Sequence, residues 1–367
     1  MASTIVDTII GQEPEYVYFH YDGKYGHRRE VLKDGKLKTT FTDIPLIDIA
    51  GLFSDNLTDQ VKVADEIRKA CEEVGFFYIK NHGVEQELID DTVEVMKDYF
   101  RQPTEKKMDQ WIYKNTNLQG YEPIFGARLD DTKSRGDRKE SFLLTYDPEL
   151  DPVPPQLTAL QRALLVENNF PADQPDFKDQ LVSYHSRLIR LSRVLVQAFA
   201  LALGLEKTAL DGLFSSPHST MKIIHYPPQE PESQDETGIG AHTDFDTFTI
   251  LWQDTVGGLE VLNANAHWVP AHPIPGTFVV NVGDFLMRMS NGRFVSTVHR
   301  VSNTTGHERY SLPFFFSSNH YATVEPLSAC LTPENPPQYE PLTVYEYYQK
   351  RQKQQRERFL NRGFLDK

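Results

Sequence analysis

The half of the chain that follows Met221 is a succession of short β-type runs, and their spacing limits the possible folds more than any other feature. The runs are rich in β-branched and aromatic residues and are separated by glycine, proline, asparagine and aspartate: Thr247–Trp252, Gly258–Leu262, Thr277–Val282, Val295–Val301 and Tyr310–Phe316. Short strands at such intervals are typical of antiparallel sandwiches and jelly rolls. We therefore predict an α+β fold with a mainly β core, in which two facing sheets leave an open mouth.

The preceding part of the chain has a helical rhythm. Apolar residues recur at spacings of three and four, which predicts amphipathic helices that flank the β core; these are Thr58–Val74, Glu85–Phe100 and Gln180–Leu203. Two short strands are expected at Ile44–Ile49 and Phe76–Lys80, and Gly204 is a natural stop for the longest helix. We interpret His185, within that helix, and His82, in the turn after the second strand, as structural residues.

These patterns divide the chain into four regions. We expect an N-terminal extension, a helical and mixed N-terminal region, a jelly-roll core and a C-terminal segment with a helix, at residues 1–43, 44–205, 206–325 and 326–367. The extension has turn signals that suit one hairpin, and we assign it no chemistry. The last helix opens with a capping box at Thr343–Glu346. Residues 341–367 carry seven Lys and Arg against three Asp and Glu, which favours a solvated helix on the acidic body over a nucleic-acid site.

Two histidines and one aspartate in the β-rich half form a candidate metal site. His242 and Asp244 are two residues apart, so on a strand their side chains share a face. His299 lies in a later run that follows an Asn291-Gly292 turn signal. A lone H-x-D occurs by chance in many proteins, so the pattern becomes specific only with its complements. Two imidazoles and one carboxylate on one side of a metal form the facial triad of non-haem Fe(II) oxygenases, which leaves coordination positions open.

A candidate carboxylate site follows the last histidine of that set. Arg309 and Ser311 are again two residues apart, so a guanidinium and a hydroxyl share one strand face. A guanidinium fork grips a carboxylate bidentately. Tyr226, in the sequence His225-Tyr226-Pro227-Pro228, could add a second hydroxyl.

Taken in order, these motifs resemble the isopenicillin N synthase-like family of 2-oxoglutarate/Fe(II)-dependent dioxygenases. The resemblance covers more than half of the chain, through the segments Ile44–Asp48, Gly75–Val84, Lys139–Phe142 and Met221–Phe316. It implies a double-stranded β-helix, Fe(II) bound by His242, Asp244 and His299, and 2-oxoglutarate held by Arg309, Ser311 and Tyr226. It also implies a reaction with O2 that releases succinate and CO2 and oxidises, most commonly hydroxylates, a small organic molecule. A specialised metabolite fits that class of substrate.

Several alternatives remain open. Many family members have asparagine two residues before the tyrosine of the Tyr-Pro motif, whereas this chain has Ile224, which leaves the orientation of the keto acid undefined. A few relatives keep the R-x-S pattern but use no 2-oxoglutarate. Desaturation, cyclisation and ring expansion start from the same oxidation as hydroxylation. A non-catalytic jelly roll that binds a small molecule is the alternative from a different class, and the presence of all three ligands argues against it.

Four aromatic residues are candidates for contact with the substrate. Tyr113, Tyr121 and Phe125 lie in a segment that lines the mouth of the site in the family, although packing under a long loop explains them equally. Phe245 directly follows Asp244, so it belongs either to the pocket wall or to the core.

Composition bears mainly on partners and location. The net charge of −14 argues against general affinity for nucleic acid or anionic membranes. The chain has two cysteines, too few for a disulfide framework, and no apolar run of transmembrane length. No secretory signal is visible at the N-terminus, so we expect a cytoplasmic enzyme with a small-molecule substrate. The oligomeric state is left open.

Overall fold

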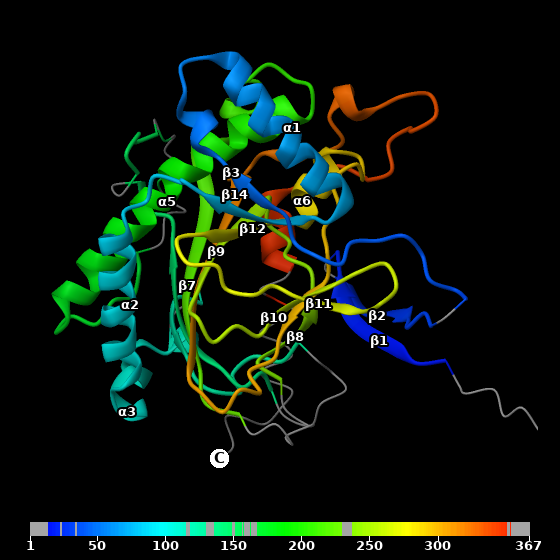
Figure 1. Cartoon of the computed structure of the whole chain (residues 1–367). Helices are drawn as coiled ribbons and strands as arrows, with labels where there is room; N and C mark the ends of the chain where they lie inside the picture. The colour runs from blue at the N-terminus through cyan, green and yellow to red at the C-terminus, as the bar shows by residue number, and fades with distance from the viewer. Residues whose placement is uncertain are drawn as a thin grey trace, which may run out of the picture.

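Two mainly antiparallel sheets face each other in the core of the protein, with helices packed on one side (Figure 1). The computed structural model describes residues 14–22, 24–33, 35–114, 118–129, 136–148, 151–155, 157, 162, 167–229, 237–350 and 353. The fold is the predicted one, an α+β chain with a jelly-roll core. Within the described residues, no helix is both long enough and apolar enough to cross a bilayer.

The larger sheet has eight strands, in the order β3-β4-β12-β9-β14-β7-β6-β5. Their bounds are β3 Leu46–Asp48, β4 Phe76–Lys80, β5 Gly120–Glu122, β6 Glu140–Thr145, β7 Pro217–Tyr226, β9 Phe248–Gln253, β12 Phe278–Val282 and β14 Arg309–Asn319. Strands from before and after residue 206 therefore lie in one sheet. The four-region division of the chain stays a prediction, and this sheet joins two of those regions.

The smaller sheet has six strands, in the order β11-β10-β13-β8-β1-β2. Their bounds are β1 Tyr16–Tyr21, β2 Lys24–Glu30, β8 Ile239–His242, β10 Leu259–Leu262, β11 Trp268–Pro270 and β13 His299–Val301. The predicted hairpin of the extension exists as β1 and β2, and β1 adds in parallel to β8, with His20 opposite His242. β15 (Thr323–Val324) and β16 (Leu342–Thr343) form a separate pair.

Three helices cover one face of the larger sheet: α1 Leu57–Glu73, α2 Gln86–Phe100 and α5 Pro175–Ala202. Two shorter helices are α3 Thr104–Lys107 and α6 Asp284–Met289, and the short 3-10 turns are η1 Ala50–Phe53, η2 Met108–Gln110, η3 Ile112–Lys114, η5 Asp211–Phe214 and η6 Ser328–Cys330. Three predicted helices agree to within a few residues, the largest difference being at the start of α5. Asn56 caps α1 by accepting from the Thr58 amide, and Gly204 follows α5 with φ +80°.

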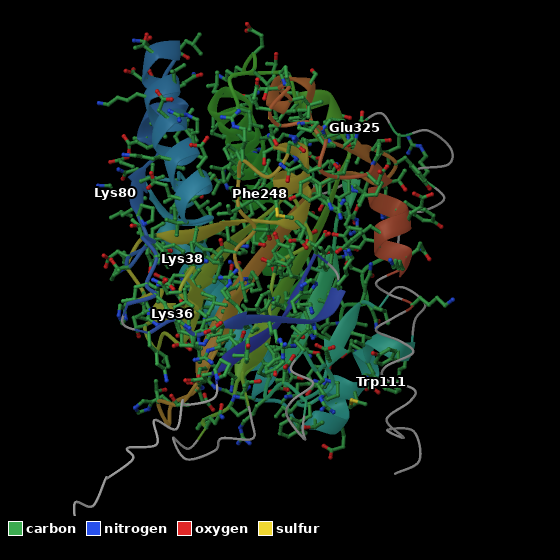
Figure 2. The ribbon with its side chains drawn as sticks, turned by 90° about the vertical axis from the view of Figure 1, so that its right-hand side faces the viewer. Lys36, Lys38, Lys80, Trp111, Phe248 and Glu325 are labelled. Carbon is green, nitrogen blue, oxygen red and sulfur yellow. The ribbon has the colours of Figure 1, made fainter. Side chains whose placement is uncertain are left out.

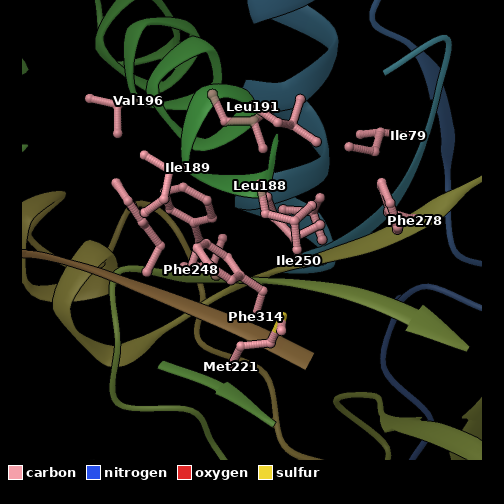
Figure 3. Packing of buried hydrophobic residues seen from close by; sticks show 14 of the residues in the cluster. Ile79, Leu188, Ile189, Leu191, Val196, Met221, Phe248, Ile250, Phe278 and Phe314 are labelled. Carbon is pink, nitrogen blue, oxygen red and sulfur yellow. The ribbon is translucent and has the colours of Figure 1, made fainter. Parts of the chain in front are cut away.

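Alternate residues of the larger sheet face the helices and form the main core. Phe248 and Ile250 on β9 meet Leu188 and Ile189 on α5 in this cluster (Figure 3). Figure 2 shows Phe248 in the interior, whereas Lys36, Lys38 and Lys80 lie at the periphery. The intervening residues of the same strands face the other sheet, and they shape the site described below.

One predicted strand and one predicted turn differ from the structure. The run 295–301 is a strand only at His299–Val301, and the backbone amide of Val295 donates to the Cys71 carbonyl of α1 rather than to a neighbouring strand. Asn291 and Gly292 have φ of 51° and 79°, as a tight turn requires. They end the short helix α6 rather than join two strands.

The C-terminal helix is described over residues 344–350. Its predicted capping box is present: Thr343 Oγ1 donates to Glu346 Oε2 at 2.7 Å and accepts from the Glu346 amide at 3.2 Å. The predicted continuation to Phe359 lies outside the described residues, apart from residue 353, which is also helical.

Candidate active site

The three candidate metal ligands meet in the smaller sheet. His242 ends β8 and His299 begins the neighbouring strand β13, directly opposite it. Asp244 lies in the loop just past β8, and its Oδ1 is 3.5 Å from His242 Nε2 and 3.7 Å from His299 Nε2. One donor atom of each residue lies within 4.8 Å of the other two. Three side chains from two strands and a loop thus converge on one point.

Backbone carbonyls fix how the two imidazoles present their nitrogens. His242 Nδ1 is 2.8 Å from the Gly240 carbonyl, and His299 Nδ1 is 3.3 Å from the Thr297 carbonyl. A carbonyl only accepts, so each Nδ1 carries a proton, and each Nε2 faces Asp244. Burial, with the nearby His242 ring, lowers the pKa of His299 to about 4. The ring is therefore neutral near pH 7, as a metal ligand must be.

Asp244 is held by the larger sheet. Its Oδ2 accepts from Thr249 Oγ1 at 2.5 Å and from Asn281 Nδ2 at 2.8 Å, so Oδ1 alone is left toward the two imidazoles. Burial acts to raise the pKa of Asp244, but the facing His299 and His242 rings and the Thr249 hydroxyl lower it below its usual range. The carboxylate is thus ionised, and its Oδ1 points toward the two imidazoles.

A buried guanidinium lies in the same cavity. Arg309 begins β14 opposite Tyr226 on β7; it is fully buried, and its guanidinium carbon lies 4.7 Å from the centre of the Tyr226 ring. Nε donates to the Gly257 carbonyl, and Nη2 lies 3.4 Å from Gln253 Oε1. Among the described residues Nη1 has no hydrogen-bond partner. A buried donor left in this way requires a partner, and an anionic ligand in the cavity would supply it.

The cavity between the sheets has a volume of about 330 Å³, within the range of small-molecule sites. Its wall includes the three candidate ligands, Arg309, Ser311 and Tyr226, and the apolar side chains of Leu143, Ile224, Leu251, Leu259, Val301 and Phe315. Phe76 lies edge-on to His299, with the ring centres 5.2 Å apart. An apolar wall around polar groups that point at one spot is the usual form of a binding site.

The C-terminal helix closes one end of this cavity. Tyr347 and Tyr348 both line it, and the Tyr348 hydroxyl donates to the Asp246 carboxylate. Phe245 packs against both tyrosines, with ring centres 5.7 Å and 5.1 Å apart. Phe245 therefore lines the cavity and also packs on the edge of the main core, so each of the two interpretations of this residue is partly right.

The other three aromatic candidates differ in whether they line the cavity. Tyr113 lines the cavity. Tyr121 does not: it is buried in the core, where its hydroxyl donates to Glu140 Oε2 at 2.6 Å. Phe125 is not on the cavity wall either, and its φ of 64° turns the chain there. Substrate contact stays a prediction for all three residues, and the cavity wall supports it for Tyr113 but not for Tyr121 or Phe125.

Several residues on the cavity wall were missed from the sequence, among them His20, Lys222, Thr249 and Asn281. Lys222 and Thr249 had a usable signal, since they share strand faces with Tyr226 and Leu251 by the rule of alternation. His20 had none, because its place depends on the pairing of β1 with β8. His82 is confirmed as a turn residue, since its Nδ1 accepts from the Val84 amide and its ring packs on Phe278.

Comparison with known proteins agrees with this geometry. The model of the 2OG-Fe(II) oxygenase superfamily matches residues 217–318, and the model of the non-haem dioxygenase in morphine synthesis N-terminal region matches residues 44–173. The chain is 36% identical over 341 residues to the 2-oxoglutarate-Fe(II) type oxidoreductase ppzC of Metarhizium rileyi, covering 88% of this chain and 90% of that protein. It is also 36% identical over 302 residues to homoarginine-6-hydroxylase 2-ODD-233 of Oryza sativa subsp. japonica, covering 79% and 90%.

A solved structure shows the same likeness. A Neurospora crassa protein, in complex with alpha-KG and 5-formyluracil, superimposes with a TM-score of 0.72 at 26% identity, covering 84% of this chain and 95% of that one. The chain therefore belongs to the 2OG-Fe(II) oxygenase superfamily. It is a 2-oxoglutarate-dependent dioxygenase that acts on small molecules and uses iron, 2-oxoglutarate and O2.

Proposed function

We propose that His242, Asp244 and His299 bind the Fe(II) of this dioxygenase, and that Arg309, Ser311 and Tyr226 hold the far carboxylate of 2-oxoglutarate. The observation that carries this proposal is that the three ligand atoms and the unpartnered Nη1 of Arg309 share one cavity. The donor set fits iron, since two imidazoles and a carboxylate leave positions open. The guanidinium fits the cosubstrate, because it is buried and cationic and because its Nη1 has no partner within the described part of the chain.

When bound, iron and 2-oxoglutarate together supply the activation of O2, with release of succinate and CO2 and oxidation of the organic substrate. The protein's own residues bind, orient and exclude water. Thr249 and Asn281 keep Asp244 on one oxygen, and the Gly240 and Thr297 carbonyls keep both imidazoles turned toward it. The apolar wall keeps water away from the reacting atoms.

Ile224 replaces the polar group that many relatives have beside the keto acid. It is buried opposite Ser311 and lines the cavity, so it offers the cosubstrate an apolar contact and no hydrogen bond. We infer that the orientation of 2-oxoglutarate depends on the metal at one end and on Arg309 with Ser311 at the other.

We further propose hydroxylation of a small specialised metabolite as the reaction. Support comes from the size of the cavity and from relatives whose names specify a hydroxylase of homoarginine. The cytoplasmic location and the absence of nucleic-acid and membrane partners stay predictions from composition.

The test is the stoichiometry of the purified protein with Fe(II). We expect succinate to form only when 2-oxoglutarate is supplied, with O2 uptake that rises in the presence of a substrate. O2 uptake without any 2-oxoglutarate would instead indicate an oxidase of the same fold. Absence of both signals, with Fe(II) bound, would favour the non-catalytic binding protein.

A further inference from the structure

Lys222 places an amine in the middle of the cavity wall. It lies on β7, on the same face as Thr220, Ile224 and Tyr226, and opposite Leu143 of β6. Its side chain is partly buried. Lysine in such a position is uncommon, because a cation removed from water normally needs a partner.

The other charged side chains on the wall already have partners. Lys139 forms an ion pair with Glu122 at 3.0 Å, and both side chains are almost fully buried. Asp137 accepts from the backbone amides of Leu129 and Gly240 at 3.3 Å. Of the charged residues that line the cavity in the described part of the chain, only Lys222 has neither a hydrogen bond nor an ion pair from its side chain.

The backbones of Lys222 and Arg309 lie at different levels of the larger sheet. Tyr226 faces Arg309 across the strands, and Lys222 lies four residues away from Tyr226 along β7. At about 3.3 Å per residue this separates the two backbone positions by roughly 13 Å. In the other direction, His218 of the same strand face touches Tyr348 of the C-terminal helix, with ring centres 4.3 Å apart. Lys222 thus lies between the proposed cosubstrate end and the end closed by that helix.

We propose that Lys222 binds a carboxylate of the substrate, and hence that the enzyme oxidises small organic acids. This inference rests on the proposed function, because it takes the Arg309 end of the cavity as the place of 2-oxoglutarate. A single ammonium suits a carboxylate better than a phosphate monoester, which carries more charge and would need more donors than this wall offers. Thr220, next on the same face, also lines the cavity and offers a hydroxyl on that side of the wall.

Electrostatics agree with this geometry. Burial lowers the pKa of Lys222, although Glu122 acts in the opposite direction. A bound carboxylate would favour the charged amine and raise that pKa again. The substrate would then supply a direct ion-pair partner, which Lys222 lacks among the described residues, in addition to the charges of Glu122 and Asp137 that already act on it.

The experiment compares acids with their primary amides on the full chain loaded with Fe(II) and 2-oxoglutarate without O2. The probes are hexanoate and hexanamide, 4-phenylbutyrate and 4-phenylbutyramide, and N-acetylleucine and its amide, with affinities from ligand-observed NMR. We expect at least one acid to bind about 10- to 100-fold more tightly than its amide, as loss of a hydrogen bond to a charged group implies. Lys222→Met should abolish this difference, Lys222→Arg should keep most of it, and Lys80→Met, on the surface, should not change it.

Three results would overturn the proposal. They are equal affinities for acids and amides in the unmodified protein, a preference for acids that survives in Lys222→Met, and no binding by any acid. The 2-oxoglutarate affinity of Lys222→Met is measured in parallel, and a tenfold loss there would assign the amine to the cosubstrate instead. Failure of the unmodified protein to bind 2-oxoglutarate in the presence of Fe(II) would contradict the proposed function itself, which separates the two failures.

Discussion

The two sheets of the jelly roll differ in what they pack against. The eight-stranded sheet has α1, α2 and α5 on one face and, together with these helices, forms most of the largest hydrophobic cluster. The six-stranded sheet contributes to two much smaller clusters, and it carries His242 and His299. The comparison indicates that stability and chemistry depend on different parts of the molecule. Burial of apolar residues under the helices stabilises the fold, whereas polar groups around the open cavity provide the chemistry.

The strands of the larger sheet contribute both to the hydrophobic core and to the active site, through residues on opposite faces. Thr249 and Asn281 alternate along their strands with Phe248 and Val280, which belong to the main core. Neighbouring residues on one strand therefore serve different purposes. Substitutions on opposite faces of β9 should test this separation.

Phe248→Ala should have the largest effect on stability. The ring is fully buried and packs on Phe199 of α5 and Phe316 of β14, with ring centres 5.2 Å and 5.3 Å apart. Loss of a buried phenylalanine costs about 3–5 kcal/mol of the free energy of unfolding. Denaturant unfolding measures this, and we expect Fe(II) affinity of the folded fraction to stay unchanged. A loss of metal binding equal to the loss of stability would break the comparison.

Arg309→Leu should have the next largest effect, on the cosubstrate alone. Removing one member of a desolvated charge pair costs about 2–5 kcal/mol, or roughly 30- to several-thousand-fold in affinity. The 2-oxoglutarate concentration for half-maximal succinate formation should rise accordingly. Arg300→Leu is the control, since Arg300 pairs with Glu260 at 2.7 Å and is partly exposed. An unchanged 2-oxoglutarate requirement in Arg309→Leu would refute the assignment.

Thr249→Val should weaken metal binding by about 10–100-fold, the usual effect of losing a group that orients a metal ligand. The reason is that Asp244 Oδ2 loses its 2.5 Å hydrogen bond and the carboxylate can turn. Thr247→Val is a matched control, because the Thr247 hydroxyl is buried and has no hydrogen-bond partner among the described residues. Equal Fe(II) titrations for the two variants would show that the larger sheet does not position Asp244.

The last of these predictions concerns how the free energy of unfolding depends on pH. His185 of α5 is fully buried, with Nε2 3.0 Å from Ser219 Oγ, and burial lowers its pKa to about 4. The unfolded chain takes up a proton below about pH 6.5 whereas the folded one does not, so stability falls as pH drops from 6.5 toward 4. This group should contribute about 1.4 kcal/mol per pH unit in that window.

His185→Gln should therefore flatten the dependence of the free energy of unfolding on pH, measured by denaturant melts between pH 4 and 7. His307→Gln, at an exposed histidine, is the control. An identical slope for the unmodified protein and His185→Gln would contradict a buried neutral imidazole.

The periodicity of apolar residues was sufficient to predict the helices and several strands of the scaffold. The predicted and observed bounds of β4 are the same, and those of α1 and α2 differ by one residue, because caps, alternation and apolar stripes are local signals. The spacing of His242 and Asp244, together with His299 and the family resemblance, named three residues that the fold brings together.

What the sequence could not show depends on contacts between distant segments. The pairing of β1 with β8 puts His20 on the cavity wall, although the extension was assigned no chemistry. The same extension is anchored by Asp22, which accepts from Arg288 at 2.6 Å, 266 residues later in the chain. Lys222 could be placed on a strand face from its sequence, but the absence of a side-chain hydrogen bond or ion pair to it among the described residues could not be foreseen.

The central claim is that the open site binds metal while the helix-packed sheet holds the fold. It is tested most directly by Fe(II) titration of Asp244→Ala, with succinate formation and a thermal melt on the same samples. The account predicts loss of at least roughly 90% of metal-dependent turnover, since a direct ligand should matter no less than a group that orients one, about 10–100-fold. It also predicts a melting temperature no lower than that of the unmodified protein. More than roughly a tenth of the turnover retained, or a large drop in melting temperature, would contradict it.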